Sequence, residues 1–336
     1  DGTLTWGQLA SRVGQLAAAM RRRGVSAGDR VAVRLPRSTH LATAITAVHA
    51  IGASYVPLDP SYPHERIRAG IDLAGVRFEI SAPSLEALAD RIGVDDVGVD
   101  GHPWDDETPP PPLPAVTEAD EAYVIFTSGS TGTPDGVAIT HGQLASSTNA
   151  RGEFYRDDPE RFVVPSSISF DSSLVGIFWT MSTGGTLLFP DDHVIHDIDA
   201  MVAFIDTYGP SHLLCVPTLY NALLTRKPEG GRWPEHVIVA GEACPAHLVE
   251  LHHRLAPDSS LTNEYGPTEA TVWATAHACR PGGAIVPIGA PIAGTWVTVV
   301  DNAGNVLPTG AAGELVIGGS GIADGYLGSD PDERFI

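Results

Sequence analysis

The chain has 336 residues, 43% of them hydrophobic, and carries a formal net charge of −21. This length predicts one large domain or two joined lobes, and the negative charge argues against nucleic acid or an anionic membrane as a partner. No run of about 18 apolar residues is present, so a membrane span is not expected. The start lacks the basic and apolar regions of a signal peptide and begins close to a helix, so we expect an excerpt of a longer protein.

Helices and strands alternate in the pattern of residues 1–100, the expected first lobe. Thr5 and Gln8 have the spacing of a capping box, which predicts a helix that ends at Gly24. Ser38 can cap a second helix. The strands expected on either side of that second helix are 29–36 and 54–59. Such alternation is typical of a parallel sheet with helices on both faces.

An acidic, proline-rich connector at 101–120 separates this lobe from a second β/α lobe, expected at 121–280. The connector predicts a stiff surface segment, with a polyproline ligand for another protein as the alternative. The strands expected in the second lobe are 122–127, 161–170, 185–189, 212–217, 236–241 and 260–265. After Pro281 short strands and turns predict a smaller β-subdomain at 281–336.

A run of small and hydroxylated residues, TSGSTG, follows the predicted strand 122–127 directly. Its glycines let backbone N–H groups turn inward around an anion, and ligands bind at the carboxyl ends of such strands. The lysine of a Walker loop is missing. Phosphate binding and an ordinary surface loop are the alternatives at this point. The six residues are Thr127, Ser128, Gly129, Ser130, Thr131 and Gly132.

Four segments resemble, in the same order, motifs of the adenylate-forming enzymes, which include acyl-CoA synthetases, luciferases and the adenylation domains of nonribosomal peptide synthetases. They are AIGASYVPLDPSYPHERI (50–67), TSGSTGTPDGV (127–137), NEYGPTEATV (263–272) and GELVIGGSGIADGYL (313–327). The resemblance implies the N-terminal core of an adenylation domain, an α/β fold of parallel sheets flanked by helices with a smaller C-terminal β-subdomain. The lobe that carries the family's catalytic lysine is expected beyond Ile336.

The resemblance also assigns chemical roles and implies ATP and Mg²⁺ as cofactors. Glu269 would hold Mg²⁺, a hard cation that binds oxygen ligands, and Thr268 would donate to the α-phosphate, so these two are the predicted catalytic residues. The other predicted nucleotide-binding residues are Gly241, Glu242, Ala243, Glu264, Tyr265 and Gly266. Asp135 stands where the family has lysine, which should weaken ATP binding unless its carboxylate faces solvent.

The segment SISFDSSLVGIF resembles the amino-acid-activating branch of the family, in which an aspartate at the position of Asp171 pairs with the substrate's α-ammonium group. A buried carboxylate is costly unless it is paired, and an amino acid supplies the cation. The alternative, compatible with the first, is that Asp171 caps the helix that follows it. The substrate-binding residues implied are Phe170, Asp171, Ser172, Val175, Leu214, Ile238, Ala240, Glu264, Val272 and Trp273.

These pocket positions are mostly apolar, and Glu264 is the only second charge among them. Since a buried acceptor needs a partner, the set favours a large side chain with a polar tip, such as tyrosine or a modified tyrosine. A basic side chain paired with Glu264, or an apolar one with Glu264 turned away, are the alternatives.

The implied reaction is attack of an amino-acid carboxylate on the α-phosphorus of ATP, which gives aminoacyl-AMP and pyrophosphate. The acyl group would pass to the phosphopantetheine thiol of a carrier protein in natural-product biosynthesis, and an MbtH-like protein is a further implied partner. One alternative is an aryl- or acyl-acid ligase of the same fold. Another is a degenerate, non-catalytic binding module, which Asp135 and the missing lobe favour.

Cysteines and histidines indicate no metal site. Cys215, Cys244 and Cys279 form no CxxC pair and are expected to be buried thiols of a cytoplasmic protein. His193 and His196 lie among carboxylates but lack a zinc-binding pattern, so a solvated loop is expected there.

Overall fold

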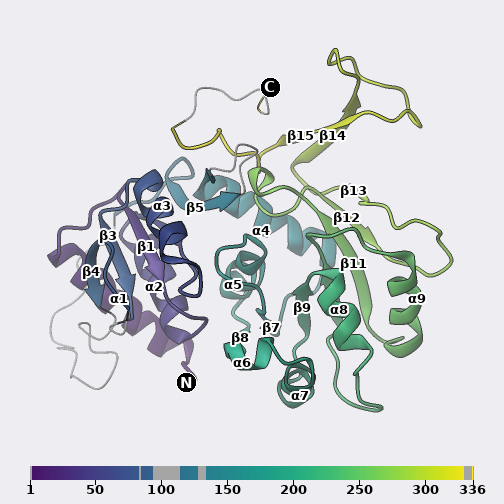
Figure 1. The fold of residues 1–336 in the computed structure, drawn as a ribbon, viewed down its shortest axis with the longest axis horizontal. Helices are drawn as coiled ribbons and strands as arrows, with labels where there is room; N and C mark the ends of the chain where they lie inside the picture. Colours follow the sequence, from purple (N-terminus) through teal and green to yellow (C-terminus); the bar gives the residue numbers. More distant parts are fainter. Residues whose placement is uncertain (1, 83–84, 94–113, 128–133, 329–334, 336) are drawn as a thin grey trace. The chain divides into compact units, whose positions relative to one another are not determined.

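Two separate β-sheets organise the chain into two units in the computed structural model (Figure 1). The structure describes residues 2–82, 85–93, 114–127, 134–328 and 335. Unit 1 consists of Asp1–Gly142, Ser167–Phe170 and Asp324–Ile336, and unit 2 of Gln143–Ser166 and Asp171–Ala323. The predicted α/β class, with parallel sheets flanked by helices, is confirmed.

Unit 1 contains a six-stranded sheet in the order β4-β3-β1-β2-β5-β6, parallel except for β6, which runs antiparallel to β5. Its strands are β1 (Arg30–Arg34), β2 (Ser54–Pro57), β3 (Phe78–Ser81), β4 (Asp90–Gly93), β5 (Glu121–Thr127) and β6 (Asp135–Thr140). Its helices are α1 (Trp6–Arg22), α2 (Thr39–Ala50) and α3 (His64–Ala74).

The helix starts predicted in unit 1 are confirmed. The Thr5 hydroxyl accepts a hydrogen bond from the Gln8 N–H while the Gln8 side chain accepts from the Thr5 N–H, so the capping box opens α1. The Ser38 hydroxyl accepts from the N–H of Leu41 at the start of α2. These caps satisfy N–H groups that have no partner inside a helix.

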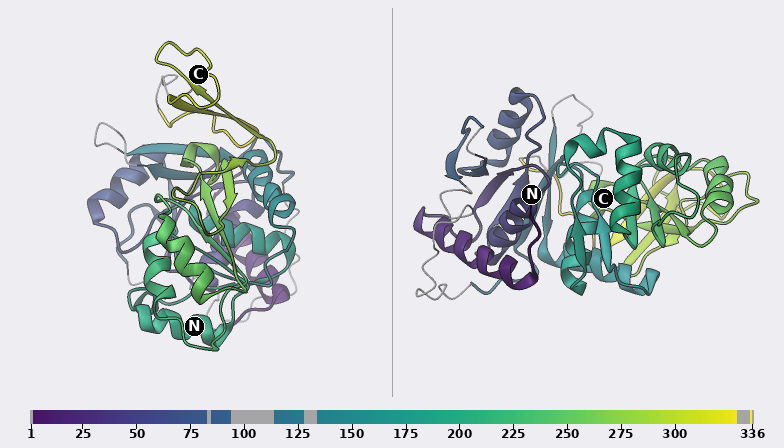
Figure 2. Two further views of the ribbon diagram at one scale, coloured as in Figure 1. Left: turned by 90° about the vertical axis from the view of Figure 1, so that its right-hand side faces the viewer. Right: turned by 90° about the horizontal axis from the view of Figure 1, so that it is seen from below.

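Unit 2 contains a seven-stranded sheet in the order β13-β12-β11-β10-β9-β7-β8 and a separate two-stranded sheet, β14-β15 (Figure 2). Its strands are β7 (Arg161–Val163), β8 (Thr186–Leu188), β9 (His212–Cys215), β10 (His236–Val239), β11 (Ser260–Tyr265), β12 (Thr275–Ala278), β13 (Ala290–Pro291), β14 (Thr295–Val300) and β15 (Glu314–Gly319). The helices are α4 (His141–Tyr155, which begins in unit 1), α5 (Ser172–Thr183), α6 (Asp192–Ile195), α7 (Ile198–Tyr208), α8 (Pro217–Leu224), α9 (Ala246–Leu255) and the 3₁₀ turn η2 (Thr268–Ala270).

The seven-stranded sheet separates two apolar clusters, because successive side chains of a strand point to opposite faces. Leu213, Val237 and Leu261 pack with α7, α8 and α9 on one face, here called the α7–α9 face. Leu214 and Ile238, which are register partners, pack with α4 and α5 on the other, here called the α4/α5 face.

The boundary between the two units differs from the expected one. β5 pairs with β2, and β6 pairs with β5, so both strands belong to the first sheet and unit 1 extends to Gly142. The segment 281–336 is also divided, because β13 joins the seven-stranded sheet and the chain from Asp324 onward belongs to unit 1. The pairing of β5 with β2 and the return of the chain after Asp324 join distant segments, which a local pattern does not reveal. Residues 101–113 of the connector lie outside the described residues.

Several smaller expectations are settled by the same structure. The three cysteines are buried and free, as predicted. The segment 191–199, expected to be a solvated loop, contains the short helix α6.

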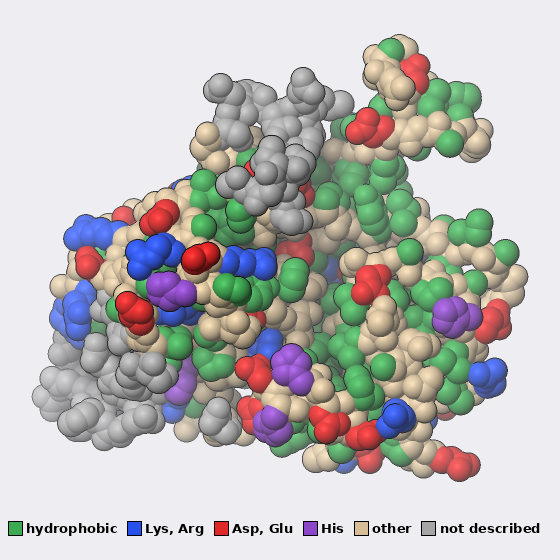
Figure 3. All heavy atoms as spheres, in the orientation of Figure 1, with side chains coloured by type: hydrophobic (Ala, Val, Ile, Leu, Met, Phe, Trp, Pro, Cys, Tyr) green, Lys and Arg blue, Asp and Glu red, His purple; other side chains and the backbone are tan. Residues whose placement is uncertain are grey.

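Among the described residues, no group of three or more metal-binding side chains occurs, and no helix is long and apolar enough to cross a membrane. Acidic side chains are spread over the face shown in Figure 3 and do not form a single patch.

Candidate functional site

Two segments of unit 2 meet at the N-terminal end of α5. Asp171 occupies the N-cap position of α5, but its side chain makes no capping hydrogen bond there. The hydroxyl of Thr268, which begins the turn η2 after β11, lies close enough to lower the pKa of the Asp171 carboxyl, and the charge of Glu269 acts on it as well. The predicted ammonium-binding residue and the two predicted catalytic residues therefore lie together.

The electrostatics of this group favour a cation. Burial raises the pKa of Asp171 to about 6, the polar hydroxyl of Thr268 and the backbone N–H of Ser172 oppose the rise, and the nearby Glu269 carboxylate adds to it. A positive group placed between two carboxylates would stabilise both in their charged forms. A half-buried carboxylate with a raised pKa in such a cluster is typical of a functional site.

The turn that carries Thr268 is held in shape by a close backbone approach. A Cβ atom on Gly266 would lie 2.5 Å from Cα of Trp273 and 2.8 Å from the nitrogen of Ala274. Past the turn, Val272 has a φ of 80°, a left-handed conformation that β-branched residues rarely adopt. Such local strain persists only where surrounding contacts fix the backbone, so the turn is a rigid support for Thr268.

The residues predicted to bind the nucleoside lie at one edge of the sheet. Parallel strands β10 and β11 are paired up to Val239 and Asn263, so the segment 241–243 and Tyr265 lie side by side at their carboxyl ends. Tyr265 is exposed, as are Gly241, Glu242 and Ala243. This edge is where ligands bind in parallel α/β sheets.

Glu242 has a structural partner at that edge. Its carboxylate accepts hydrogen bonds from the N–H (3.1 Å) and the hydroxyl (2.6 Å) of Thr218, in the first turn of α8. The contact fixes the segment after β10 to the start of a helix. It leaves the backbone of Gly241 and Ala243 as the surface offered to a ligand.

The structure brings the predicted apolar pocket residues together on the α4/α5 face. Asp171 and Ser172 open α5, which packs on that face. The residues in the shared cluster are Val175, Leu214, Ile238, Val272 and Trp273. Ala240 directly follows β10, whereas Phe170 is exposed and belongs to unit 1. The roles of these residues toward a substrate stay predictions.

One premise about this pocket is wrong. Glu264 is not an acceptor in need of a substrate partner, because it is buried and bound by Arg151, with Nη1–Oε1 at 2.7 Å and Nη2–Oε2 at 3.2 Å. The Tyr155 hydroxyl also donates to it. Arg151 and Tyr155 lie one turn apart on α4 and carry no sequence signal, because an arginine in a helix usually predicts a solvent-facing side chain.

Most of the predicted phosphate loop, Ser128 to Gly132, lies outside the described residues. Its flanks are described: Thr127 ends β5, Asp135 begins β6, and the two are register partners in the antiparallel pair. The Asp135 side chain is half-buried. The loop therefore joins two strands of a hairpin in unit 1, and its anion-binding role stays a prediction.

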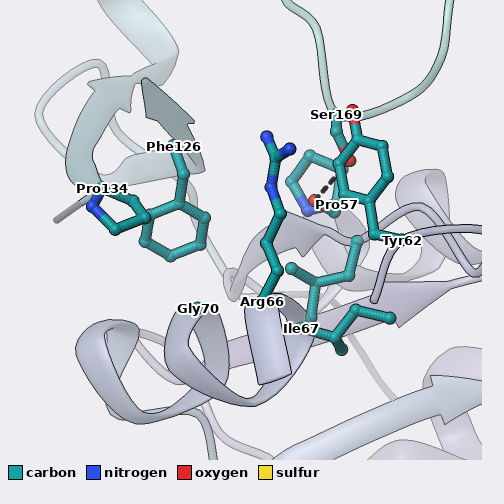
Figure 4. Close-up of a pocket in the computed structure, with 9 residues that line it drawn as sticks. Pro57, Tyr62, Arg66, Ile67, Gly70, Phe126, Pro134 and Ser169 are labelled. Atoms are coloured by element: carbon teal, nitrogen blue, oxygen red, sulfur yellow. Dashed lines mark hydrogen bonds between the residues drawn. The ribbon is translucent and has the colours of Figure 1, made fainter. Parts of the chain in front are cut away.

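Unit 1 also has a pocket that the sequence motifs did not predict (Figure 4). It is mainly apolar, with the Arg66 guanidinium 4.1 Å from the centre of the Tyr62 ring and the Ser169 hydroxyl donating to the carbonyl of Pro57. Its lining residues are Pro57, Leu58, Tyr62, Arg66, Ile67, Gly70, Phe126, Pro134 and Ser169. Several of these lining residues belong to the motif at 50–67. That motif is the sequence feature that could have indicated a pocket in this part of unit 1.

Thr268, Glu269 and the exposed segment 241–243 all follow the carboxyl ends of the parallel strands β10 and β11, which is where ligands bind in α/β sheets. Residues 1–327 match the family model described as AMP-binding enzyme. The chain belongs to the AMP-binding enzyme family, which confirms the resemblance to adenylate-forming enzymes.

Curated relatives of the chain are much longer peptide synthetases. The chain is 34% identical over 332 residues to tyrocidine synthase 2 of Brevibacillus parabrevis, an alignment that covers 97% of this chain and 9% of that protein. It is 32% identical over 346 residues to the dimodular nonribosomal peptide synthase of Bacillus subtilis (strain 168), which covers 100% of this chain and 14% of that protein. The chain thus spans about a tenth of the length of these relatives.

Solved structures show the same fold. A four-domain nonribosomal peptide synthetase bound to AMP and glycine matches with a TM-score of 0.84 and 26% identity, over 97% of this chain and 24% of that one. The N-terminal subdomain of NpsA from Klebsiella oxytoca, in complex with 3-hydroxybenzoyl-AMSN, matches with a TM-score of 0.87 and 24% identity, over 98% of this chain and 82% of that one.

Proposed function

We propose that this chain is the core of an amino-acid adenylation domain, which uses ATP to convert an amino acid into aminoacyl-AMP with release of pyrophosphate. The observation that carries the proposal is the half-buried Asp171 carboxylate close to Thr268 and Glu269. A buried carboxylate gains from the ammonium group of an amino acid. An aryl or fatty acid, which has no such group, gains nothing from it.

In the proposed reaction a carboxylate oxygen of the amino acid bonds to the α-phosphorus of ATP while the bond from that phosphorus to the bridging oxygen breaks. Asp171 holds the ammonium group, and Thr268 connects this group to the α-phosphate. The segment 241–243 and Tyr265 hold the nucleoside. Such transfers depend mainly on positioning and on charge stabilisation, and both are supplied by fixed side chains and backbone.

The residues near Asp171 fit Mg²⁺. Glu269 supplies carboxylate oxygens and Thr268 supplies a hydroxyl, and both are hard donors. Mg²⁺ in proteins is commonly bound by one or two carboxylates and takes its remaining ligands from phosphate and water. When bound, Mg²⁺ neutralises phosphate charge. We assign Glu269 as its ligand.

Substrate and partners follow from the same proposal. The apolar α4/α5 face favours a large side chain, and tyrosine stays a prediction, although the paired Glu264 no longer requires a polar tip. The activated acyl group passes to the phosphopantetheine thiol of a carrier protein. An MbtH-like protein is a further proposed partner, so activity is assayed with and without it.

Amino-acid-dependent exchange of pyrophosphate into ATP, measured with the full-length protein, tests this function. We expect exchange with one amino acid or a small related group. Exchange with an aryl or fatty acid lacking an amine would instead support the ligase alternative. ATP binding without exchange for any amino acid would support the non-catalytic binding module.

A further inference from the structure

Arg151 and Glu264 form an ion pair inside the apolar cluster of the α4/α5 face. The side chains are 2% and 1% exposed, so water does not compensate either charge. Three hydrogen bonds hold the Glu264 carboxylate, two from Arg151 and one from the Tyr155 hydroxyl. Both charges are therefore balanced within the protein.

The guanidinium group is fixed from its other side by aromatic rings. It lies 4.1 Å from the centre of the Trp273 ring and 5.8 Å from that of Trp179. The indole N–H of Trp273 donates to the carbonyl of Ser147 on the same helix α4, which anchors the ring. Arg151 is thus held between Glu264 and two tryptophans and has little freedom to move away.

This pair lies among the residues predicted to line the side-chain pocket. Glu264 itself, Trp273, and the cluster of Val175, Leu214 and Ile238 share the α4/α5 face. With Glu264 neutralised, that lining presents no net charge. A cationic side chain would find no free carboxylate there, and an anionic one no free guanidinium, so both would lose hydration without gaining a partner.

We propose that Arg151 is a positioning residue that acts through Glu264 to make the site select amino acids with uncharged side chains. This inference rests on the proposed amino-acid adenylation. It replaces the expectation that Glu264 itself meets the substrate. The intact pair leaves no charge free to bind a charged substrate side chain. Removal of Arg151 should allow cationic side chains to bind, and removal of the Glu264 charge should allow anionic side chains to bind.

The test compares amino-acid preference in pyrophosphate exchange by the full-length protein, using leucine and tyrosine, ornithine and lysine, and aspartate and glutamate. Arg151→Met leaves the Glu264 carboxylate unpaired, so we expect the ratio of cationic to uncharged activity to rise about tenfold or more. Glu264→Gln leaves the guanidinium unpaired, so the ratio of anionic to uncharged activity should rise instead. In the double variant, the preference for amino acids with uncharged side chains should return.

A merely structural role would lower activity with all amino acids in proportion and leave both ratios unchanged. The matched control is Arg34→Met, which breaks the equally buried Arg34–Glu79 pair of unit 1 (2.6 Å). It should destabilise the fold without altering any ratio. If one single variant does not fold, the ratio measured for the other still decides the matter, and the double variant, which buries no lone charge, shows that the site folds without the pair.

The outcomes separate the two proposals. Wild-type exchange with ornithine or lysine, or unchanged ratios in folded variants, would overturn the role of Arg151 while adenylation stands. The absence of wild-type exchange with every amino acid would overturn the proposed function itself.

Discussion

The Thr268 hydroxyl, in the turn that follows β11, lies close enough to the Asp171 carboxyl at the start of α5 to lower its pKa. One of these segments carries the predicted ammonium-binding group, and the other carries the predicted phosphate and Mg²⁺ contacts. A displacement of either segment should therefore affect amino-acid and nucleotide binding together.

Removal of the Asp171 charge should strongly reduce amino-acid activation. For Asp171→Ala and Asp171→Asn we expect kcat/KM for the amino acid to fall about 100-fold, because truncating one member of a buried charge pair costs roughly 2–5 kcal/mol. Steady-state pyrophosphate exchange measures this. The matched control is the exposed Asp158, whose change to Ala should have no effect. Unchanged exchange in both Asp171 variants would contradict the assigned role.

The raised pKa of Asp171 predicts a pH dependence of stability. Its pKa is about 6 in the folded protein against an ordinary 3.8, so between these values the folded state keeps a proton that the unfolded state has lost. The stabilising contribution is complete below about pH 4, declines as pH rises, and is absent above about pH 6. Urea unfolding of ligand-free wild type and Asp171→Asn from pH 4 to 7 should show this decline in wild type only. Parallel curves would count against the shifted pKa.

Affinity for the amino acid should change in the opposite sense over the same window. Ammonium binding needs the charged carboxylate, so binding strengthens as pH rises through about 6 and then levels off. Equilibrium titration with the cognate amino acid at several pH values measures this. Affinity that does not vary between pH 5 and 7 would indicate that Asp171 is already ionised at the lower pH.

Gly266 should not tolerate a side chain. In Gly266→Ala the new Cβ would overlap the backbone at Trp273 and Ala274, so we expect a loss of about 1–3 kcal/mol in the free energy of unfolding and weaker exchange. Gly152→Ala is the matched control, because Gly152 lies within α4 with nothing near its Cβ position. That change should stabilise by about 0.5–1 kcal/mol. Equal effects of the two variants would refute the close-approach argument.

Asp135 should oppose the binding of ATP. Asp135→Lys replaces a negative charge beside the predicted phosphate loop with a positive one, so we expect tighter ATP binding, measured by calorimetry in the presence of Mg²⁺. Asp135→Asn separates loss of repulsion from gain of attraction and should give an intermediate affinity. If neither variant alters the affinity, the carboxylate is directed away from the nucleotide.

Much of the fold could be predicted from local signals. The caps at Thr5 and Ser38 and the strands β9, β10 and β11 follow from short patterns of polar and apolar residues. The limits of the two units could not, because β5 pairs with β2 and the chain from Asp324 rejoins unit 1. Such contacts depend on distant segments, about which a local pattern contains no information.

In the candidate site, too, some residues could be predicted from the sequence and others could not. The motif resemblance indicated Asp171, Thr268 and Glu269, and the structure brings them together. Arg151 had no sequence signal, since a charged residue on a helix normally predicts exposure. Its burial follows from a tertiary partner, Glu264, contributed by a strand far along the chain.

The alternation of side chains along β9, β10 and β11 has a consequence for how such a protein can evolve. Leu213, Val237 and Leu261 hold the sheet to α7, α8 and α9, while the neighbouring Leu214 and Ile238 face α4 and α5. Because the two sets occupy alternate positions, mutations can reshape the second surface while the first keeps the architecture intact. A change of side chain at Leu214 or Ile238 can therefore alter the α4/α5 face without disturbing the packing of the α7–α9 face.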